Sequence, residues 1–254
     1  MLPLSIQAGL WGLLAGAGLL IGVAIAFFIE LPHRLIAAVM GFGGGVLIAV
    51  LSVDLTEKAF AGGGAVPTIG GFLLGALVFS GVNWGLSQRG AKHRKRCGGC
   101  VEQPKEADVK GSGLAIAAGA LLDAIPESIV IGLSLHGGGK IGFGLVVGFF
   151  LANVPEGLSS AAGMIQAGRS ATYIFSVWGG IALISGAAAA FGNFALGGLE
   201  PEMLAIILAF AAGAILAMLA ETMIPEAFEN AQHFIGFITV IGFLMAFLLV
   251  KANA

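Results

Sequence analysis

Six carboxylates lie within stretches of the chain that are otherwise apolar enough to be buried in lipid: Asp54, Glu57, Asp123, Glu127, Glu156 and Glu221. An acid inside a membrane is costly and by default marks a functional site. No Lys or Arg is expected to lie deep enough in these stretches to neutralise the charges. The pattern therefore predicts that a metal ion, or protons passing through, compensates them.

The most specific pattern is a Pro-Glu pair that recurs in the middle of two successive apolar stretches. The two segments read Asp123-Ala-Ile-Pro126-Glu127 and Asn153-Val-Pro155-Glu156. Residues three or four apart share one face of a helix, so each segment can present two oxygen-bearing side chains to one point.

Each proline also removes a backbone hydrogen bond one turn back, which leaves the carbonyls of Leu122 and Leu151 in need of a partner. A cation is such a partner. The alternative is a pair of bent helices whose acids are protonated and hydrogen-bonded. Because the acid follows a midspan proline twice, the cation site is the favoured interpretation.

The elements that must position these residues are membrane-spanning helices. The 254 residues are 58% hydrophobic and 10% charged, with a mean hydropathy of +1.00, whereas soluble domains carry roughly 25% charged residues. A span needs about 20 apolar residues, and eight such runs occur, at about residues 6–29, 35–57, 67–88, 112–135, 141–165, 171–197, 203–225 and 233–251. We therefore expect an all-α, polytopic membrane protein with one domain over residues 1–254, the lipid bilayer as a partner and no nucleic acid.

Glycine is frequent, with 42 residues, and often recurs four positions apart. Such spacing is typical of seams where membrane helices pack closely, and it is compatible with a homodimer. The pairs are Gly12/Gly16, Gly18/Gly22, Gly41/Gly45, Gly71/Gly75, Gly81/Gly85 and Gly144/Gly148.

The basic residues predict the orientation in the cell membrane. Nine of the 12 Lys and Arg residues fall in the loops after the first, third and fifth spans. Because cytoplasmic loops are enriched in Lys and Arg, both termini are expected outside. Residues 89–111 then form one basic cytoplasmic loop, in which Cys97 and Cys100 are either a weak metal relay or a solvated pair.

The second and seventh spans share a weak similarity. Aligned without gaps from Gly45 and Gly213, they have five identical residues in sixteen. They run in opposite directions, as do the fourth and fifth spans, which predicts inverted repeats around a central helix 4/5 pair, as in secondary transporters. Their acids, Asp54, Glu57, Glu221 and Glu226, are secondary or pathway candidates. Glu57 and Glu226 could simply mark helix ends, whereas Asp54 and Glu221 lie deeper in the apolar runs.

The order of these features resembles the ZIP family of divalent metal transporters. The resemblance covers nearly the whole chain: eight spans, a long polar loop after the third, Pro-Glu motifs on the fourth and fifth, and an Ile-Pro-Glu-Ala segment at residues 224–227. It implies that metal is coordinated between helices 4 and 5, by Asp123, Glu127, Asn153 and Glu156.

The chain looks like a divergent, bacterial-type member of that family. Asp123 replaces the helix 4 motif histidine, and Ser185 stands where many members place an acid on helix 6. One metal site is therefore the safer expectation. His136, at the outer end of helix 4, either collects metal at the entrance or is incidental.

The resemblance implies Zn as cargo, whereas oxygen ligands without histidine favour harder ions such as Mn or Fe(II). The expected function is membrane transport of divalent cations (Zn, Mn or Fe), with the metal as substrate and no catalytic cofactor. The alternative is a proton- or Na-coupled transporter of another small solute on the same scaffold. An intramembrane enzyme is not expected, because neither Asp54 nor Asp123 lies in a hydrolase-like motif.

Overall fold

The computed structural model describes residues 2–91, 112–135, 143–230 and 233–252. This part of the chain is helical and contains no strand. Eight helices within it are long and apolar enough to cross a membrane: Leu4–Phe28, His33–Gly63, Ala65–Arg89, Ser112–Ser134, Phe143–Gln166, Ala171–Leu196, Pro201–Glu229 and Ile235–Ala252. They match the eight predicted spans within a few residues, so the predicted polytopic all-α fold is confirmed.

Four of these spans are single α-helices: α1 (Leu4–Phe28), α5 (Ser112–Ser134), α6 (Phe143–Gln166) and α10 (Ile235–Ala252). The other four combine an α-helix with a π-helical turn: α2 (His33–Val50) with η1 (Leu51–Leu55) and α3 (Thr56–Gly63), α4 (Ala65–Leu86) with η2 (Ser87–Ala91), α7 (Ala171–Phe191) with η4 (Gly192–Leu196), and α8 (Pro201–Met218) with η5 (Leu219–Met223) and α9 (Ile224–Asn230).

Local sequence explains several of the helix ends. Gly64 has a φ of 71° and makes the tight connection between α3 and α4, a conformation that glycine adopts without steric cost. The Ser170 side chain accepts a hydrogen bond from the Tyr173 amide at 3.2 Å and caps the start of α7. Pro201 opens α8, where its missing N–H costs nothing.

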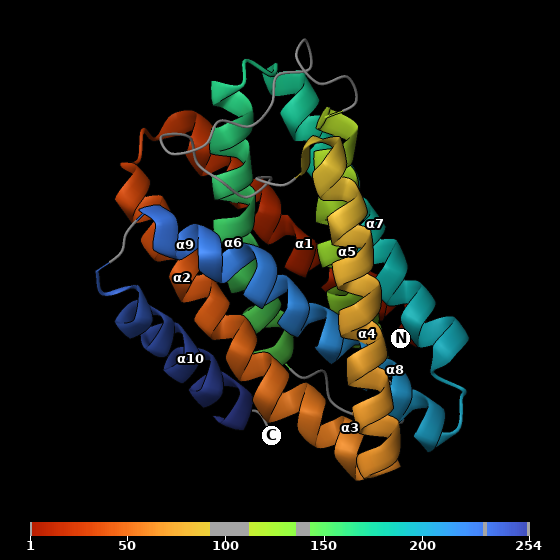
Figure 1. The fold of residues 1–254 in the computed structure, drawn as a ribbon. Helices are drawn as coiled ribbons and strands as arrows, with labels where there is room; N and C mark the ends of the chain where they lie inside the picture. Colours follow the sequence, from red (N-terminus) through yellow and green to blue (C-terminus); the bar gives the residue numbers. More distant parts are fainter. Residues whose placement is uncertain (1, 92–111, 136–142, 231–232, 253–254) are drawn as a thin grey trace.

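The same helix contacts occur twice in the bundle. The two sets correspond when the first three spans are matched with the last three, and the fourth span with the fifth. Helix α2 packs on α10 as α8 packs on α4, and α1 packs on α6 as α7 packs on α5. Figure 1 shows α2 and α8 crossing the molecule in opposite directions, and α5 and α6 likewise. This arrangement is the one expected for inverted repeats around α5 and α6, although α5 and α6 touch each other only narrowly.

The π-helical turns strengthen the correspondence between the second and seventh spans. When Gly45 is aligned with Gly213, the turn Leu51–Leu55 falls on the turn Leu219–Met223. The first of these turns contains Asp54 and the second contains Glu221. Because π-helical turns often mark functional sites, their matched positions are more informative than the weak sequence identity.

Five of the six predicted glycine pairs lie at close helix contacts. A methyl group placed on Gly22, Gly45 or Gly75 would lie 2.1, 1.9 or 2.0 Å from a backbone oxygen of another helix. The sixth pair, Gly81/Gly85, has nothing within 4 Å of such a methyl group. The prediction of a packing seam within the chain is therefore wrong for that pair, because Gly81 and Gly85 lie on the face of α4 that is turned away from the other described helices.

The two largest of three apolar clusters among the described residues hold most of the bundle together. The larger one includes Leu47 of α2, Phe79 of α4 and Phe149 of α6. The smaller one surrounds Trp178 of α7, which is fully buried, and draws on α1, α5, α6 and α7. Ala124 of α5 belongs to the smaller core, so the residue beside Asp123 is anchored by packing.

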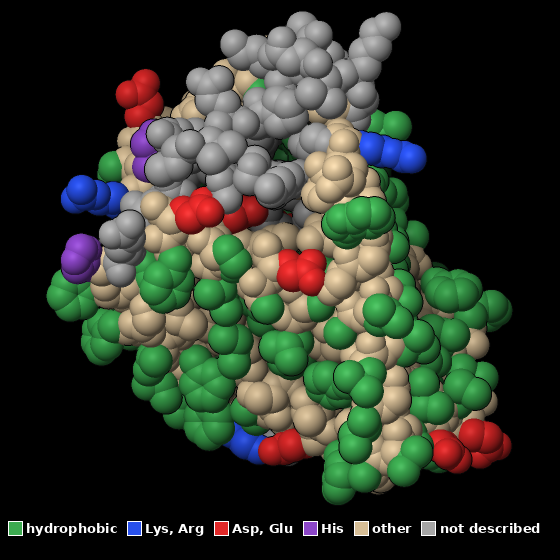
Figure 2. Space-filling model, viewed as in Figure 1, with side chains coloured by type: hydrophobic (Ala, Val, Ile, Leu, Met, Phe, Trp, Pro, Cys, Tyr) green, Lys and Arg blue, Asp and Glu red, His purple; other side chains and the backbone are tan. Residues whose placement is uncertain are grey.

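Charged side chains gather mainly at the two ends of the molecule, and the band between them is largely hydrophobic (Figure 2). Both chain ends lie in the lower half of Figure 1. An even number of spans with both termini on one side agrees with a multi-pass membrane protein. The placement of that side outside the cell stays a prediction.

Candidate metal-binding site

The helix 4 motif lies on α5. Asp123 and Glu127 are buried, with 2% and 3% of each residue exposed. Pro126 is inside the helix, which continues without a break from Ser112 to Ser134. Ser128 donates a hydrogen bond at 2.7 Å to the carbonyl of Ala124, within the same helix. The structure thus places two carboxylates one helical turn apart on the interior side of an unbroken helix.

The helix 5 motif lies on α6, which also continues through its proline, Pro155. Asn153 and Glu156 are buried, with 6% and 3% exposed. The Asn153 Nδ2 atom donates a hydrogen bond of 3.0 Å to the carbonyl of Ala15 in α1. This bond orients the amide and leaves its carbonyl oxygen Oδ1 as the atom able to bind a cation.

Two further polar residues, missed in the sequence, belong to the same part of α6. Ser159 and Ser160 are each 2% exposed and follow Glu156 by three and four positions. Residues at that spacing lie above one another on a helix. The spacing could have indicated them, but serine is common in membrane helices without a binding role.

Helix α2 contacts both the proline of the α6 motif and the end of the π-helical turn η5. A methyl group on Gly43 would lie 2.6 Å from Pro155 Cγ and 3.4 Å from Met223 Cε. Glu226, three residues after Met223, is 5% exposed. The Ile-Pro-Glu-Ala segment, which follows Met223, therefore packs on α2, the helix that also contacts Pro155.

The buried carboxylates do not form a closed metal cage. Across residues 2–91, 112–135, 143–230 and 233–252, no three His, Cys, Asp or Glu side chains gather in a way that could hold a metal ion. A cation held by α5 and α6 in this arrangement would need amide, hydroxyl or backbone oxygens to complete its coordination.

Two of the six carboxylates have lysine partners, contrary to the expectation that no Lys or Arg would neutralise them. Lys58 Nζ lies 2.8 Å from Asp54 Oδ1 and 3.0 Å from Oδ2. Lys251 Nζ lies 3.5 Å from Glu57 Oε2. The expectation was wrong because the second span continues as a helix to Gly63, so that Lys58, one turn after Asp54, folds back onto it.

Two other pathway candidates have their recorded contacts with helices other than α6. Glu221 is exposed and accepts hydrogen bonds from Ser80, and from Asn83 Nδ2 at 2.7 Å, both on α4. Ser185 is buried against α1, where its Cβ lies 3.3 Å from a methyl group placed on Gly16. His136, Cys97 and Cys100 lie outside the described residues.

A cavity of about 190 Å³, here called the Asp54 pocket, opens between the second, fourth and seventh spans. Its lining includes Asp54, Lys58, Val130, Leu133, Ser134 and Leu208. Val130 and Ser134 follow Glu127 by three and seven positions, so they share the helical face that carries Asp123 and Glu127.

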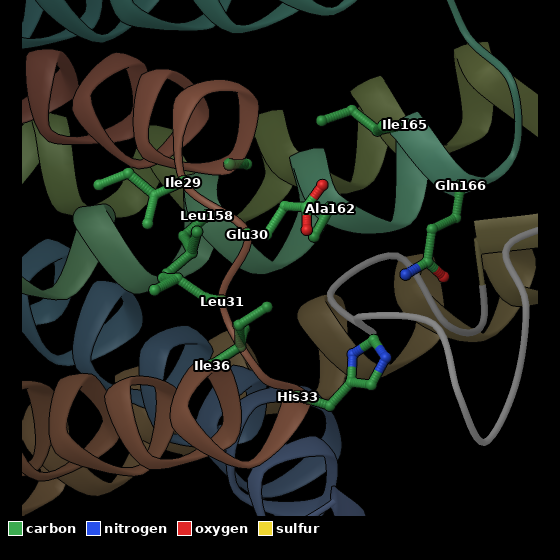
Figure 3. Close-up of a pocket in the computed structure, with 10 residues that line it drawn as sticks. Ile29, Glu30, Leu31, His33, Ile36, Leu158, Ala162, Ile165 and Gln166 are labelled. Carbon is green, nitrogen blue, oxygen red and sulfur yellow. The ribbon is translucent and has the colours of Figure 1, made fainter.

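A second cavity, of about 230 Å³, lies between the end of α1, the start of α2 and the end of α6. Figure 3 shows Ile29 and Leu158 along one side of it, and His33 and Gln166 along the other. Leu158 lies about half a turn from Glu156 on α6, so this cavity faces away from the buried carboxylate.

A search of family models finds no match to the chain. Individual relatives do match. A protein of Salmonella arizonae named zinc transporter ZupT is 30% identical over 226 residues, which cover 85% of each chain. The chain belongs to the ZIP family. The zinc transporter ZupT of Escherichia coli strain K12 / DH10B is 28% identical over 225 residues, again 85% of each chain. Together with the eight apolar helices, family membership makes this a multi-pass membrane protein, and the resemblance seen in the sequence is confirmed.

Proposed function

We propose that this ZIP-family member transports divalent metal cations across the membrane, with zinc as the first candidate. The observation that carries the proposal is the burial of Asp123, Glu127 and Glu156 on two proline-bearing membrane helices. Carboxylates within a membrane are costly and by default mark an ion pathway or binding site. Zinc is the metal named for the relatives.

The proposed binding residues are Asp123 and Glu127 of α5 with Asn153 and Glu156 of α6. Asn153 would contribute Oδ1, because its Nδ2 is engaged by the Ala15 carbonyl. The carbonyls of Leu122 and Leu151, one turn before each proline, are further oxygen ligands. A set made only of oxygens also suits Mn and Fe(II), so these metals belong in the same test.

Transport then requires movement of α5 and α6. No three carboxylates gather around one point among the described residues, while α5 and α6 touch only narrowly. A divalent cation attracts both helices, and the gain in Coulomb energy on closing around it is large where water is excluded. Binding at one face, closure and reopening toward the other face would move the ion across the membrane.

The test is metal uptake by proteoliposomes that contain the purified chain. Uptake of Zn, Mn, Fe(II) and Mg is compared between the wild type and the variants Glu127→Gln and Glu156→Gln, which preserve side-chain size. Each variant should lower uptake of the preferred metal at least about tenfold, the cost of losing roughly 1.4 kcal/mol of cation binding.

The matched control is Glu202→Gln, which removes one carboxylate from the exposed first turn of α8. It should transport as the wild type does. If both buried variants also keep full uptake, the carboxylates do not carry the metal and the assignment of the site is wrong.

The second candidate is a transporter that couples protons or Na⁺ to another small solute. The lack of a three-ligand carboxylate group among the described residues favours it, because a monovalent ion needs fewer anionic ligands. Flux that is insensitive to every divalent ion but driven by a pH step would support this candidate over metal transport.

A further inference from the structure

We propose that the Asp54 pocket is a loading site for a divalent cation, and that the Lys58 ammonium holds the place of that cation until metal displaces it. The inference rests on the proposed transport of divalent cations. It adds a second binding site and names Lys58 as a residue that sets the apparent affinity for metal.

The first support is the geometry of the ion pair. The Lys58 ammonium contacts both oxygens of Asp54, at 2.8 and 3.0 Å, which is the position that a bidentate metal would occupy. The Asp54 side chain is 14% exposed, whereas that of Lys58 is 48% exposed. The carboxylate is thus largely enclosed by the pocket, while the lysine side chain is half-exposed and can change rotamer without unfolding the helix.

The second support is the pocket around the pair. Its volume of about 190 Å³ is enough for a metal ion with several of its waters. Val130, Leu133 and Leu208 form apolar walls, and Ser134 adds a hydroxyl. Low-dielectric walls strengthen the attraction between Asp54 and a doubly charged ion relative to bulk water.

The third support is the continuity with the buried motif. Val130 and Ser134 lie on the same face of α5 as Glu127, and Val130 is three residues away, a rise of about 4.5 Å. An ion released from Asp54 along this face of α5 would therefore next approach Glu127.

The position of Asp54 is fixed by the π-helical turn η1. The Leu51 carbonyl accepts a hydrogen bond of 2.8 Å from Thr56 Oγ1, and the Ile48 carbonyl accepts one of 2.7 Å from Ser52 Oγ. These side chains satisfy backbone groups near the turn, where the regular hydrogen-bond ladder is interrupted. The carboxylate is consequently presented by a stabilised turn.

The effect on metal affinity follows from competition for one carboxylate. A metal that binds Asp54 must first break the ion pair between Asp54 and Lys58. The free energy of that ion pair is therefore subtracted from the apparent free energy of metal binding. Partly exposed lysine–carboxylate pairs have strengths that correspond to about two- to fivefold in an equilibrium constant. Removing the ammonium should strengthen loading by that factor.

The experiment measures Zn uptake into proteoliposomes as a function of Zn concentration. Lys58→Gln should lower the half-saturating concentration about two- to fivefold, and Lys58→Met, which keeps an apolar stem, should do the same. Lys58→Arg should stay close to the wild type. Asp54→Asn should raise the half-saturating concentration, and adding Lys58→Gln to it should have no further effect, because the two residues act as a pair.

Lys251→Gln is the matched control, since it removes the same charge from a neighbouring ion pair, with Glu57. It should leave the half-saturating concentration unchanged. Equal shifts for Lys251→Gln and Lys58→Gln would reveal a general surface potential and overturn the inference. An unchanged Lys58→Gln in a chain that transports Zn would overturn it while leaving the proposed function intact. Absence of all divalent transport in the wild type would overturn both.

Discussion

Asn153 is the residue at which binding and stability can be separated. Its side chain joins α6 to α1 through the bond from Nδ2 to the Ala15 carbonyl, and its Oδ1 is proposed to bind metal. Asn193 makes a similar bond of 3.1 Å from Nδ2 to the Gly132 carbonyl, which joins η4 to α5. Both amides are buried.

Replacing either asparagine by alanine should destabilise the protein to a similar extent, by about 1 kcal/mol, because each substitution removes a buried hydrogen bond between two helices. Only Asn153→Ala should also reduce metal uptake. Thermal unfolding in detergent and proteoliposome uptake are measured on the same preparations. If Asn193→Ala reduces uptake as much as Asn153→Ala, loss of packing rather than loss of a ligand explains both.

At the scale of single residues, the sequence predicted which polar side chains are buried better than it predicted the groups that they contact. Asp123, Glu127, Asn153 and Glu156 sit in apolar stretches, where an acid or amide is less costly facing other helices than facing lipid. The pairing of Lys58 with Asp54 was missed, because it depends on the second span continuing as a helix beyond the apolar run.

At the scale of the elements, the glycine contacts give a clear prediction. Gly45→Ala and Gly75→Ala place a methyl group 1.9 or 2.0 Å from a backbone oxygen, so the helices must separate. Each should destabilise the protein by about 1–3 kcal/mol. Gly81→Ala meets nothing within 4 Å and should be neutral within about 0.5 kcal/mol.

Thermal unfolding in detergent measures these differences, and Gly81→Ala serves as the control for the substitution itself. If Gly45→Ala unfolds at the same temperature as the wild type, α2 and α10 do not pack as closely as described.

The element boundaries show which structural features a hydrophobic pattern can predict and which it cannot. Runs of about 20 apolar residues identified every span, because membrane thickness sets that length. The π-helical turns at Leu51–Leu55 and Leu219–Met223 were not predictable in this way. They add one backbone position to a turn without changing the hydrophobicity, so no periodic signal records them.

At the scale of the whole molecule, the predicted orientation can be tested with single cysteines. In a background with Cys97 and Cys100 replaced by serine, Leu2→Cys and Lys251→Cys should react with a membrane-impermeant maleimide in intact cells. Both should react because both termini are expected outside, given the excess of basic residues in the alternate loops.

Arg34→Cys, between the first and second spans, should react only after the cells are made permeable. Labelling of the two termini from opposite faces would contradict the eight-span topology. Labelling of Arg34→Cys alone in intact cells would reverse the orientation but keep the topology.

The sequence predicted only part of the pattern in which the helices pack against one another. Opposed directions and a weak similarity predicted inverted repeats, and the exchange of α1, α2 and α4 with α7, α8 and α10 agrees with them. The place of α1 between α6 and α7 could not be predicted. Glycine spacing shows that a helix is able to approach a neighbour closely, but it does not identify the neighbour.

The burial of Trp178 gives the protein an internal optical reporter. Its indole is fully enclosed by the core that joins α7 to both proline-bearing helices. Of the other two tryptophans, Trp84 is 70% exposed on α4 and Trp11 lies on α1. With those two replaced by phenylalanine, the colour and intensity of the remaining fluorescence would follow any rearrangement of the interior as metal is added, without a dye or a label.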